Sequence, residues 1–174
     1  MELANAFTAP RIFLLGPHGS GKSSIGRQLV EQGYVHLSIG LIGRLARRRL
    51  PVADLPVSLL HVMARHTPGE ALESRAAAEI LQYARTLPKV VIDGFPGHVE
   101  HLGLVGDMPQ WQFVYVLTPR SVREGRLELR AATSRRGWTP GGKSPRDALL
   151  PVLCRHLRNQ DRLLCVSNRI DTVN

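Results

Sequence analysis

Short apolar runs alternate with longer amphipathic stretches along the 174-residue chain. The short runs predict strands at 11–15, 34–37, 89–93, 111–117 and 163–166. The segments between them predict helices, of which 69–86 is long and rich in alanine. Strands that alternate with helices are typical of a parallel sheet, so the pattern predicts an α/β fold with a parallel five-stranded sheet flanked by helices.

Glycine and proline divide the rest of the chain. Pro51 and Pro56 break the region after Arg49 into short helices, and 133–145 is too rich in glycine and proline for regular structure. The sequence holds no internal repeat and no low-complexity linker, and its length is ordinary for one unit. We therefore predict a single domain over residues 1–174.

The most informative segment is 16–23, Gly-Pro-His-Gly-Ser-Gly-Lys-Ser, which fits the phosphate-binding pattern G-x-x-x-x-G-K-[ST]. A predicted strand precedes it and a helical stretch follows, which is the context that this pattern requires. In such a loop, backbone N–H groups and a helix N-terminus surround the phosphates of a nucleoside triphosphate. Lys22 would reach the β- and γ-phosphates, and Ser23 would bind Mg²⁺. The predicted nucleotide-binding residues are Gly16, His18, Gly19, Ser20, Gly21, Lys22, Ser23 and Ser24.

A second polar position lies at the end of an apolar run. Asp93 closes the predicted strand 89–93 and is followed by Gly94-Phe95-Pro96. Parallel α/β sheets bind ligands at the carboxyl ends of their strands, where an Asp of a P-loop protein holds Mg²⁺. Capping of the next helix is the alternative role for this carboxylate. The sequence thus predicts Ser23 and Asp93 as the metal-binding residues.

Positive charge dominates the chain, with 23 Lys and Arg against 14 Asp and Glu and a net charge of +9. Between Arg120 and Arg162 there are eleven basic and four acidic residues. This density fits either a nucleic acid or a site that holds several phosphates at once. Aromatic residues, on which bases stack, make up only 5% of the chain, which favours small-molecule phosphates over nucleic acid.

The sequence also bears on location. No apolar run approaches the roughly 18 residues that a membrane span needs. Residues 1–7 carry an acid and lack the basic and apolar segments of a secretory signal. Cys154 and Cys165 follow no metal-binding spacing and are expected to be reduced thiols. We therefore expect a cytoplasmic protein with no membrane partner, and the sequence does not fix its oligomeric state.

With these motifs in this order, the chain resembles the adenylate kinase and nucleoside monophosphate kinase family over residues 11–171. The resemblance rests on the P-loop, on His-Leu-Ser-Ile-Gly at 36–40 and on Asp-Gly-Phe-Pro at 93–96. It implies the three-layer P-loop NTPase fold. It also implies an acceptor-binding helical region at about 38–72 and a short LID at about 131–146 that closes over ATP.

The resemblance assigns roles to individual residues. Several arginines are what phosphoryl transfer requires, because charge spreads over the oxygens of the transferred group and must be neutralised. By analogy with the family, the residues that stabilise this group are Lys22, Arg126, Arg130, Arg136 and Arg155. By the same analogy, the acceptor would contact Ser38, Arg44, Leu72, Gly94 and His101. ATP and Mg²⁺ are the implied cofactors.

The chain departs from the family on the acceptor side. Ile39-Gly40-Leu41 replaces Thr-Gly-Asp, Gly97 replaces an Arg that clamps the acceptor phosphate, and His101 replaces a Gln that reads adenine. Loss of a charged hydrogen bond to the acceptor phosphate costs about 1.5–3 kcal/mol. We therefore expect AMP to be a poor acceptor, unless another arginine, such as Arg47 or Arg75, binds its phosphate.

The leading interpretation is a Mg²⁺-dependent phosphotransferase of the nucleoside monophosphate kinase type, which converts ATP and a nucleoside monophosphate to ADP and a nucleoside diphosphate. One alternative is a P-loop kinase that acts on another small phosphorylated or hydroxylated acceptor. Residues 23–27 resemble the P-loop helix of shikimate and gluconate kinases. A nucleotide-binding regulator or ATPase-like factor that has lost its acceptor site is a further alternative. The expected partners are small-molecule nucleotide substrates.

Overall fold

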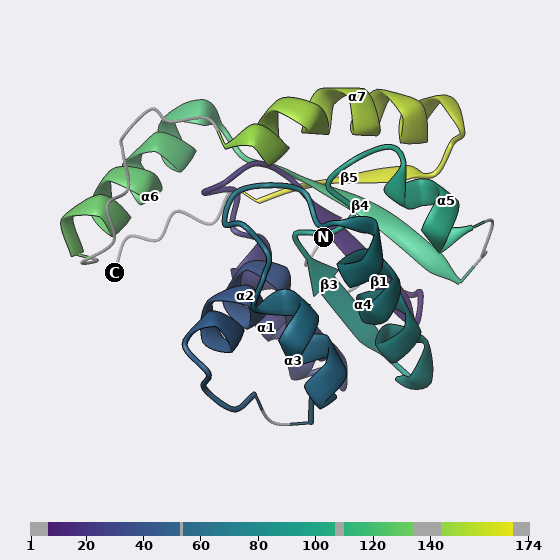
Figure 1. Ribbon diagram of the computed structural model, residues 1–174. Coiled ribbons are helices and arrows are strands. Elements are labelled where there is room, and N and C mark those ends of the chain that lie inside the picture. The colour runs from purple at the N-terminus through teal and green to yellow at the C-terminus, as the bar shows by residue number, and fades with distance from the viewer. Residues whose placement is uncertain (1–6, 53, 107–109, 134–143, 169–174) are drawn as a thin grey trace.

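The computed structural model describes residues 7–52, 54–106, 110–133 and 144–168. Its sheet has five parallel strands in the order β2-β3-β1-β4-β5 (Figure 1). The strands are β1 Arg11–Leu15, β2 Val35–Ser38, β3 Val90–Asp93, β4 Trp111–Leu117 and β5 Leu163–Ser167. The prediction of a parallel five-stranded sheet is therefore confirmed, with strand boundaries shifted by at most one residue.

Helices follow the strands as the alternating pattern predicts. They are α1 Lys22–Val30, α2 Ile39–Arg47, α3 Val57–Met63, α4 Ser74–Thr86, α5 His101–Val105, α6 Arg120–Thr133 and α7 Pro145–Asn159. The predicted start of the helix at residue 69 is wrong, because Gly69 has a φ of 84° and its carbonyl accepts a hydrogen bond from the backbone N–H of Arg146. None of these helices is both long and apolar enough to span a membrane.

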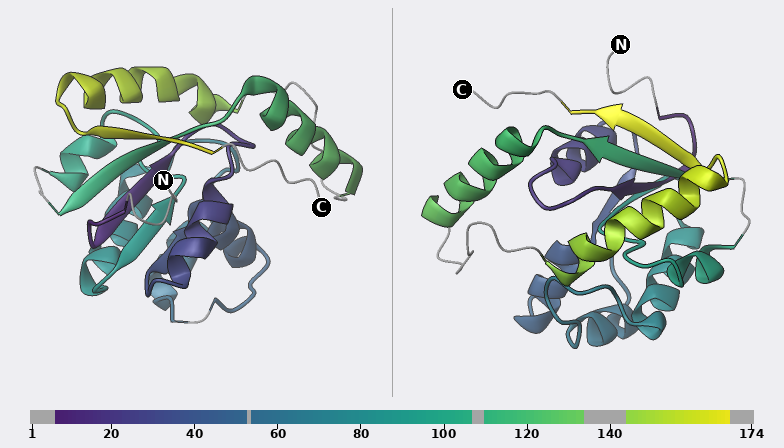
Figure 2. Two further views of the ribbon diagram at one scale, coloured as in Figure 1. Left: turned by 180° about the vertical axis from the view of Figure 1, so that it is seen from behind. Right: turned by 90° about the horizontal axis from the view of Figure 1, so that it is seen from above.

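The alternation along β1 divides the core into two parts. Phe13 and Leu15 belong to a large buried cluster that includes side chains of α4, α5 and α7. Ile12 and Leu14 belong to a second cluster, in which Ile25 and Leu29 of α1 pack on the opposite face. Neighbouring residues of a strand point to opposite faces of a sheet, so β1 is buried on both sides and the molecule has three layers (Figure 2).

The helix α6 differs from the other long helices. It extends away from the sheet (Figures 1 and 2), and none of its residues is buried. The predicted LID at about 131–146 lies mostly outside the described residues. Within the described part, 131–133 ends α6 and 145–146 begins α7.

Strand register brings the polar ends of the strands together. Asp93 of β3 pairs with Leu14 of β1 on one side and with Ser38 of β2 on the other. The P-loop follows β1 directly, so it leaves the sheet at the same edge. Ser38, Asp93 and the P-loop therefore all lie at the carboxyl edge of this sheet.

Candidate active site

The P-loop adopts a conformation that depends on its glycines. Gly16 and Gly21 have φ values of 146° and 88°, which side chains other than hydrogen rarely permit. A carbon at the Cβ position of Gly21 would lie 2.1 Å from Nδ2 of Asn168, so this position also requires glycine for space. The loop that results ends at the N-terminus of α1, where backbone N–H groups can receive phosphate oxygens.

Lys22 lies inside this loop and is only 7% exposed. Its ammonium donates to the carbonyl oxygens of Gly16 (2.6 Å) and Pro17 (2.9 Å) and to Oγ of Ser20 (3.3 Å). Burial lowers the pKa of Lys22 to about 8, against the opposing charge of Asp93. An anion in the loop would favour the charged form, so this lysine is poised to bind phosphate.

The two predicted metal-binding residues are in contact. Oγ of Ser23 donates to Oδ2 of Asp93 at 2.6 Å, and Oγ of Ser38 donates to the same oxygen at 3.4 Å. Burial alone would raise the pKa of Asp93, but His36, Lys22 and the Ser23 hydroxyl outweigh it and hold this pKa well below its usual range. An ionised carboxylate beside a hydroxyl is an oxygen donor set that fits Mg²⁺.

The carbonyl oxygen of Ser20 is held by two residues that directly follow other strands. Oγ1 of Thr118 donates to it at 2.8 Å, and Nδ2 of Asn168 donates at 3.0 Å. Asn168 is 2% exposed, and its backbone N–H pairs with the carbonyl of Leu117. The residues after β4 and β5 thus fix the shape of the P-loop, which follows β1.

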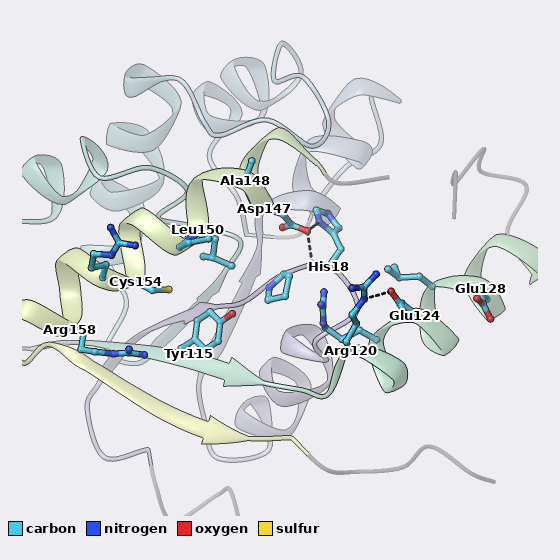
Figure 3. A pocket seen from close by; sticks show the side chains of 15 residues that line it. His18, Tyr115, Arg120, Glu124, Glu128, Asp147, Ala148, Leu150, Cys154 and Arg158 are labelled. Atoms are coloured by element: carbon cyan, nitrogen blue, oxygen red, sulfur yellow. Dashed lines mark hydrogen bonds and ion pairs between the residues drawn. The ribbon is translucent and has the colours of Figure 1, made fainter. Parts of the chain in front are cut away.

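His18 connects the P-loop to α7 (Figure 3). Oδ2 of Asp147 accepts hydrogen bonds from the backbone N–H of His18 (3.0 Å) and from its ring Nδ1 (2.9 Å). Ser144 caps α7 by accepting from the N–H of Asp147. Burial would raise the pKa of Asp147, but the two bonds from His18 outweigh it and lower the pKa to about 2.

A pocket of about 1120 Å³ opens beside this contact, between α6 and α7 (Figure 3). Its lining includes Pro17, His18, Tyr115, Asp147 and Arg155. Among the predicted transfer residues, Arg155 therefore faces this space from α7.

The other predicted arginines come from α6 and the segment after it. Nη1 of Arg126 donates to the carbonyl of Gly19 at 3.2 Å, which places this guanidinium on the P-loop. Arg130 lies one turn further along α6 and is exposed, and its charge contributes to the low pKa of Lys22. Arg136 falls outside the described residues.

The residues predicted to bind the acceptor make contacts in different parts of the structure. Ser38 joins Asp93, and half-buried Arg44 lies on α2. His101 is 4% exposed: its Nε2 donates to the carbonyl of Leu72 at 2.9 Å, and its Nδ1 accepts from the N–H of Gly97 at 3.1 Å. Burial lowers the pKa of His101, so the ring is neutral with its proton on Nε2. This histidine joins two segments of backbone.

Comparison with known proteins rests on structure. No protein-family model matches the chain, and neither does any curated protein sequence. A gluconokinase from Sinorhizobium meliloti superposes with a TM-score of 0.51 and 20% identity, covering 92% of this chain and 83% of that one. A sugar kinase from a Janibacter species gives a TM-score of 0.53 and 15% identity over 92% of this chain and 86% of that one. The chain has a P-loop kinase fold.

Three residues of this P-loop kinase fold were not predicted from the sequence. Thr118 and Asn168 fix the P-loop, and Arg146 lies against Gly94 and Gly97. Polar residues within two positions of the ends of two apolar runs were a signal for Thr118 and Asn168, since all parallel strands end at one edge. Arg146 carries no such signal, because it stands in a basic segment with many arginines.

Proposed function

We propose that this protein is an ATP-dependent kinase that transfers the γ-phosphoryl group to a small-molecule acceptor. The observation that carries the proposal is the buried Lys22 within a glycine-shaped loop, beside the 2.6 Å contact between Ser23 and Asp93. The buried cation can bind the phosphates of a nucleoside triphosphate. The ionised carboxylate and its neighbouring hydroxyl can bind the metal ion that accompanies these phosphates. The P-loop kinase fold supports this assignment.

In the proposed reaction an oxygen of the acceptor attacks the γ-phosphorus as the bond to the β–γ bridging oxygen breaks. ADP leaves, and the proton of a hydroxyl acceptor is released to solvent. Lys22 would bind the β- and γ-phosphates, while Arg126, Arg130 and Arg155 would neutralise the transferred group. Ser23 and Asp93 would hold Mg²⁺, which supplies further positive charge at these phosphates. Arg136 would add a guanidinium from the proposed LID at about 131–146.

For the acceptor, a small hydroxylated or phosphorylated metabolite has the better support. The two solved structures are a gluconokinase and a sugar kinase, and the acceptor side of this chain lacks the Arg and Gln of the monophosphate kinases at Gly97 and His101. The nucleoside monophosphate kinase reaction is the second candidate. The Asp-Gly-Phe-Pro segment at 93–96 favours it, with Ser38, Arg44 and Leu72 as acceptor contacts.

An ADP-release assay with a panel of acceptors tests the proposal. The panel holds gluconate, neutral sugars, polyols and nucleoside monophosphates, with a reaction that lacks any acceptor as the baseline. We expect ADP release to depend on one acceptor and on Mg²⁺. Lys22→Met should lower the turnover rate at least about 10²-fold, by analogy with the loss of one hydrogen-bond donor in electrostatic catalysis. Lys89→Met, at the opposite edge of the sheet, should leave it unchanged.

The same assay separates the alternatives. Turnover that needs no acceptor would instead support an ATPase-like factor or nucleotide-dependent regulator. Binding of ATP without any turnover across the panel would contradict the kinase proposal. Activity with AMP above that with every sugar or polyol would establish the nucleoside monophosphate kinase reaction.

A further inference from the structure

Two glycines near Asp93 are covered by one arginine side chain. A carbon at the Cβ position of Gly97 would lie 3.1 Å from Cγ and 3.3 Å from Cδ of Arg146. A carbon at the Cβ position of Gly94 would lie 2.8 Å from Nη1 of the same residue. The side chain of Arg146 therefore runs along the segment 94–97 from its stem to its guanidinium. In the family that this chain resembles, an arginine stands at the position of Gly97. Here Arg146 of α7 supplies a guanidinium instead.

Arg146 is held in this place at both ends. Its backbone N–H donates to the carbonyl of Gly69 at 3.1 Å, and Nη1 donates to the carbonyl of Gly94 at 3.3 Å. Nη2 lies 3.9 Å from Oδ1 of Asp147. The side chain is 16% exposed. Arg146 is thus mostly buried, and its position is fixed by backbone groups of two loops and by the first turn of α7.

The guanidinium has unused capacity to bind an anion. It carries five N–H donors, of which the described residues engage one in a hydrogen bond. The planar arrangement of these donors matches the two oxygens of a carboxylate or the edge of a phosphate. The neighbouring carboxylate does not satisfy them, because Oδ2 of Asp147 is occupied by His18 and Oδ1 has no hydrogen-bond partner among the described residues.

Charge around the site points to a second anion besides the nucleotide. Arg146 lies close enough to Lys22 to lower the pKa of that lysine. Two mostly buried cations repel each other, and the charges of Asp93 and Asp147 offset this repulsion only in part, because burial and Arg146 still leave the pKa of Lys22 lowered. Lys22 lies within the P-loop, whereas Arg146 covers Gly94 and Gly97, which belong to the segment after β3. Phosphates of the nucleotide would pair with Lys22. The guanidinium of Arg146 would then be available to bind an anionic group of a second molecule.

We propose that Arg146 binds an anionic group of the acceptor, a carboxylate or a phosphate, and so makes the enzyme specific for negatively charged acceptors. This inference rests on the proposed kinase function and adds the chemical class of its second substrate. Gly94 and Gly97 contribute by leaving the space that the arginine occupies. The residue acts in binding and specificity, and the transfer itself remains with the P-loop side.

The test measures acceptor binding while the donor site is filled. The protein is first saturated with Mg²⁺ and the β,γ-imido analogue of ATP, and then gluconate, AMP, inorganic phosphate or neutral glucitol is titrated by calorimetry. Variants are Arg146→Ala, Arg146→Lys and Arg85→Ala, in which an exposed arginine in the last turn of α4 is removed. Thermal melting of each variant shows whether it is folded before binding is measured.

We expect at least one of the anions to bind to the loaded protein and glucitol to bind at least about tenfold more weakly. Arg146→Ala should weaken binding of that anion at least about tenfold, Arg146→Lys should retain part of it, and Arg85→Ala should leave it unchanged. Affinity for the ATP analogue should be the same in all variants. The gluconate and AMP titrations decide whether a carboxylate or a phosphate is preferred.

Three results would overturn the inference and leave the kinase proposal standing. They are tighter binding of glucitol than of any anion, anion binding that survives in Arg146→Ala, and a loss in Arg146→Ala that affects the ATP analogue equally. If Arg146→Ala does not fold, full retention of anion affinity in Arg146→Lys has the same meaning. Failure of the parent protein to bind the ATP analogue would instead contradict the proposed function itself.

Discussion

Asp147 accepts two hydrogen bonds from His18 through one oxygen, so the first turn of α7 is attached directly to the P-loop. The backbone N–H of His18 belongs to the loop that would surround phosphate, and its acceptor is Oδ2 of Asp147. A residue after the proposed LID therefore determines the position of a residue in the donor site.

Loss of this contact should destabilise the fold. We expect Asp147→Ala to lower the free energy of unfolding by about 1–3 kcal/mol, because a half-buried backbone N–H and a ring N–H lose their acceptor. Urea denaturation at neutral pH measures the change. Glu128→Ala removes an exposed carboxylate from the lining of the same pocket and serves as the control, with an expected change within about 0.5 kcal/mol. An equal loss in both variants would contradict a specific role for Asp147.

Nucleotide affinity should fall as the pH rises through about 8. Burial lowers the pKa of Lys22 to about 8, and a bound phosphate would raise it, so nucleotide binding would take up a proton above this pH. We expect affinity for ATP to drop about tenfold between pH 8 and pH 9.5, measured by calorimetry in buffers of different ionisation enthalpy. In Lys22→Arg the guanidinium stays charged over this range, and the decline should disappear. A decline of the same size in that variant would assign it to another group.

Asp93→Asn should weaken the dependence on Mg²⁺ without abolishing nucleotide binding. The amide retains the shape and one acceptor oxygen for Ser23 but loses the charge that attracts the cation. We expect the Mg²⁺ concentration for half-maximal ADP release to rise at least about tenfold, while affinity for ATP in EDTA is retained. An unchanged Mg²⁺ dependence would leave Asp93 with a purely structural role.

His101 should make stability depend on pH below about 6.5. Its pKa in the folded protein is lowered by burial, so as the pH falls the unfolded chain takes up a proton before the folded protein does. The stability that the neutral ring provides is therefore full above the unfolded pKa and declines below it. His101→Gln offers an acceptor and a donor to Gly97 and Leu72 without titrating. Urea unfolding at pH 7.5 and 5.5 should show a smaller loss in this variant than in the parent. Equal losses would exclude His101 as the titrating group.

Gly97→Ala should disturb the acceptor side through Arg146. The added methyl group would lie 3.1 Å from Cγ of Arg146 and 3.2 Å from Cβ of Ala71, so the arginine must move. We expect kcat/KM for the acceptor to fall while KM for ATP stays constant. Gly103→Ala is a matched control, because a methyl group there would meet no described atom within 4 Å, and alanine favours the helix by up to about 1 kcal/mol. Unchanged kinetics in Gly97→Ala would show that this space is not critical.

The sheet and the donor site could be predicted from the sequence because their signals are local. An apolar run followed by the P-loop pattern contains the strand, the turn and the start of α1 within twenty residues. Asp93 could be paired with Ser23 since both follow parallel strands, which end at a common edge. Apolar periodicity and one local motif sufficed for these elements.

The acceptor side was not predictable in the same way. Arg146 reaches Gly94 and Gly97 from further along the chain, 52 residues beyond Gly94. The start of α4 was predicted wrongly for the same reason: a residue distant in sequence decides it, because the carbonyl of Gly69 accepts from the N–H of Arg146. His101 was expected to contact the acceptor, and the structure adds that both of its ring nitrogens bond to backbone. Contacts between distant loops decide these details, and they leave no periodic pattern.

The hydrogen bond from Asn168 to Ser20 joins residues 148 positions apart, and this has a consequence for how the protein is made. A ribosome adds about 5–20 residues per second, so the P-loop exists for roughly 7 to 30 seconds before Asn168 is synthesised. During that interval the carbonyl of Ser20 lacks one of its two partners, and β5 has not yet paired with β4. A nascent chain therefore completes the support of its P-loop only after β5 has been synthesised and has paired with β4.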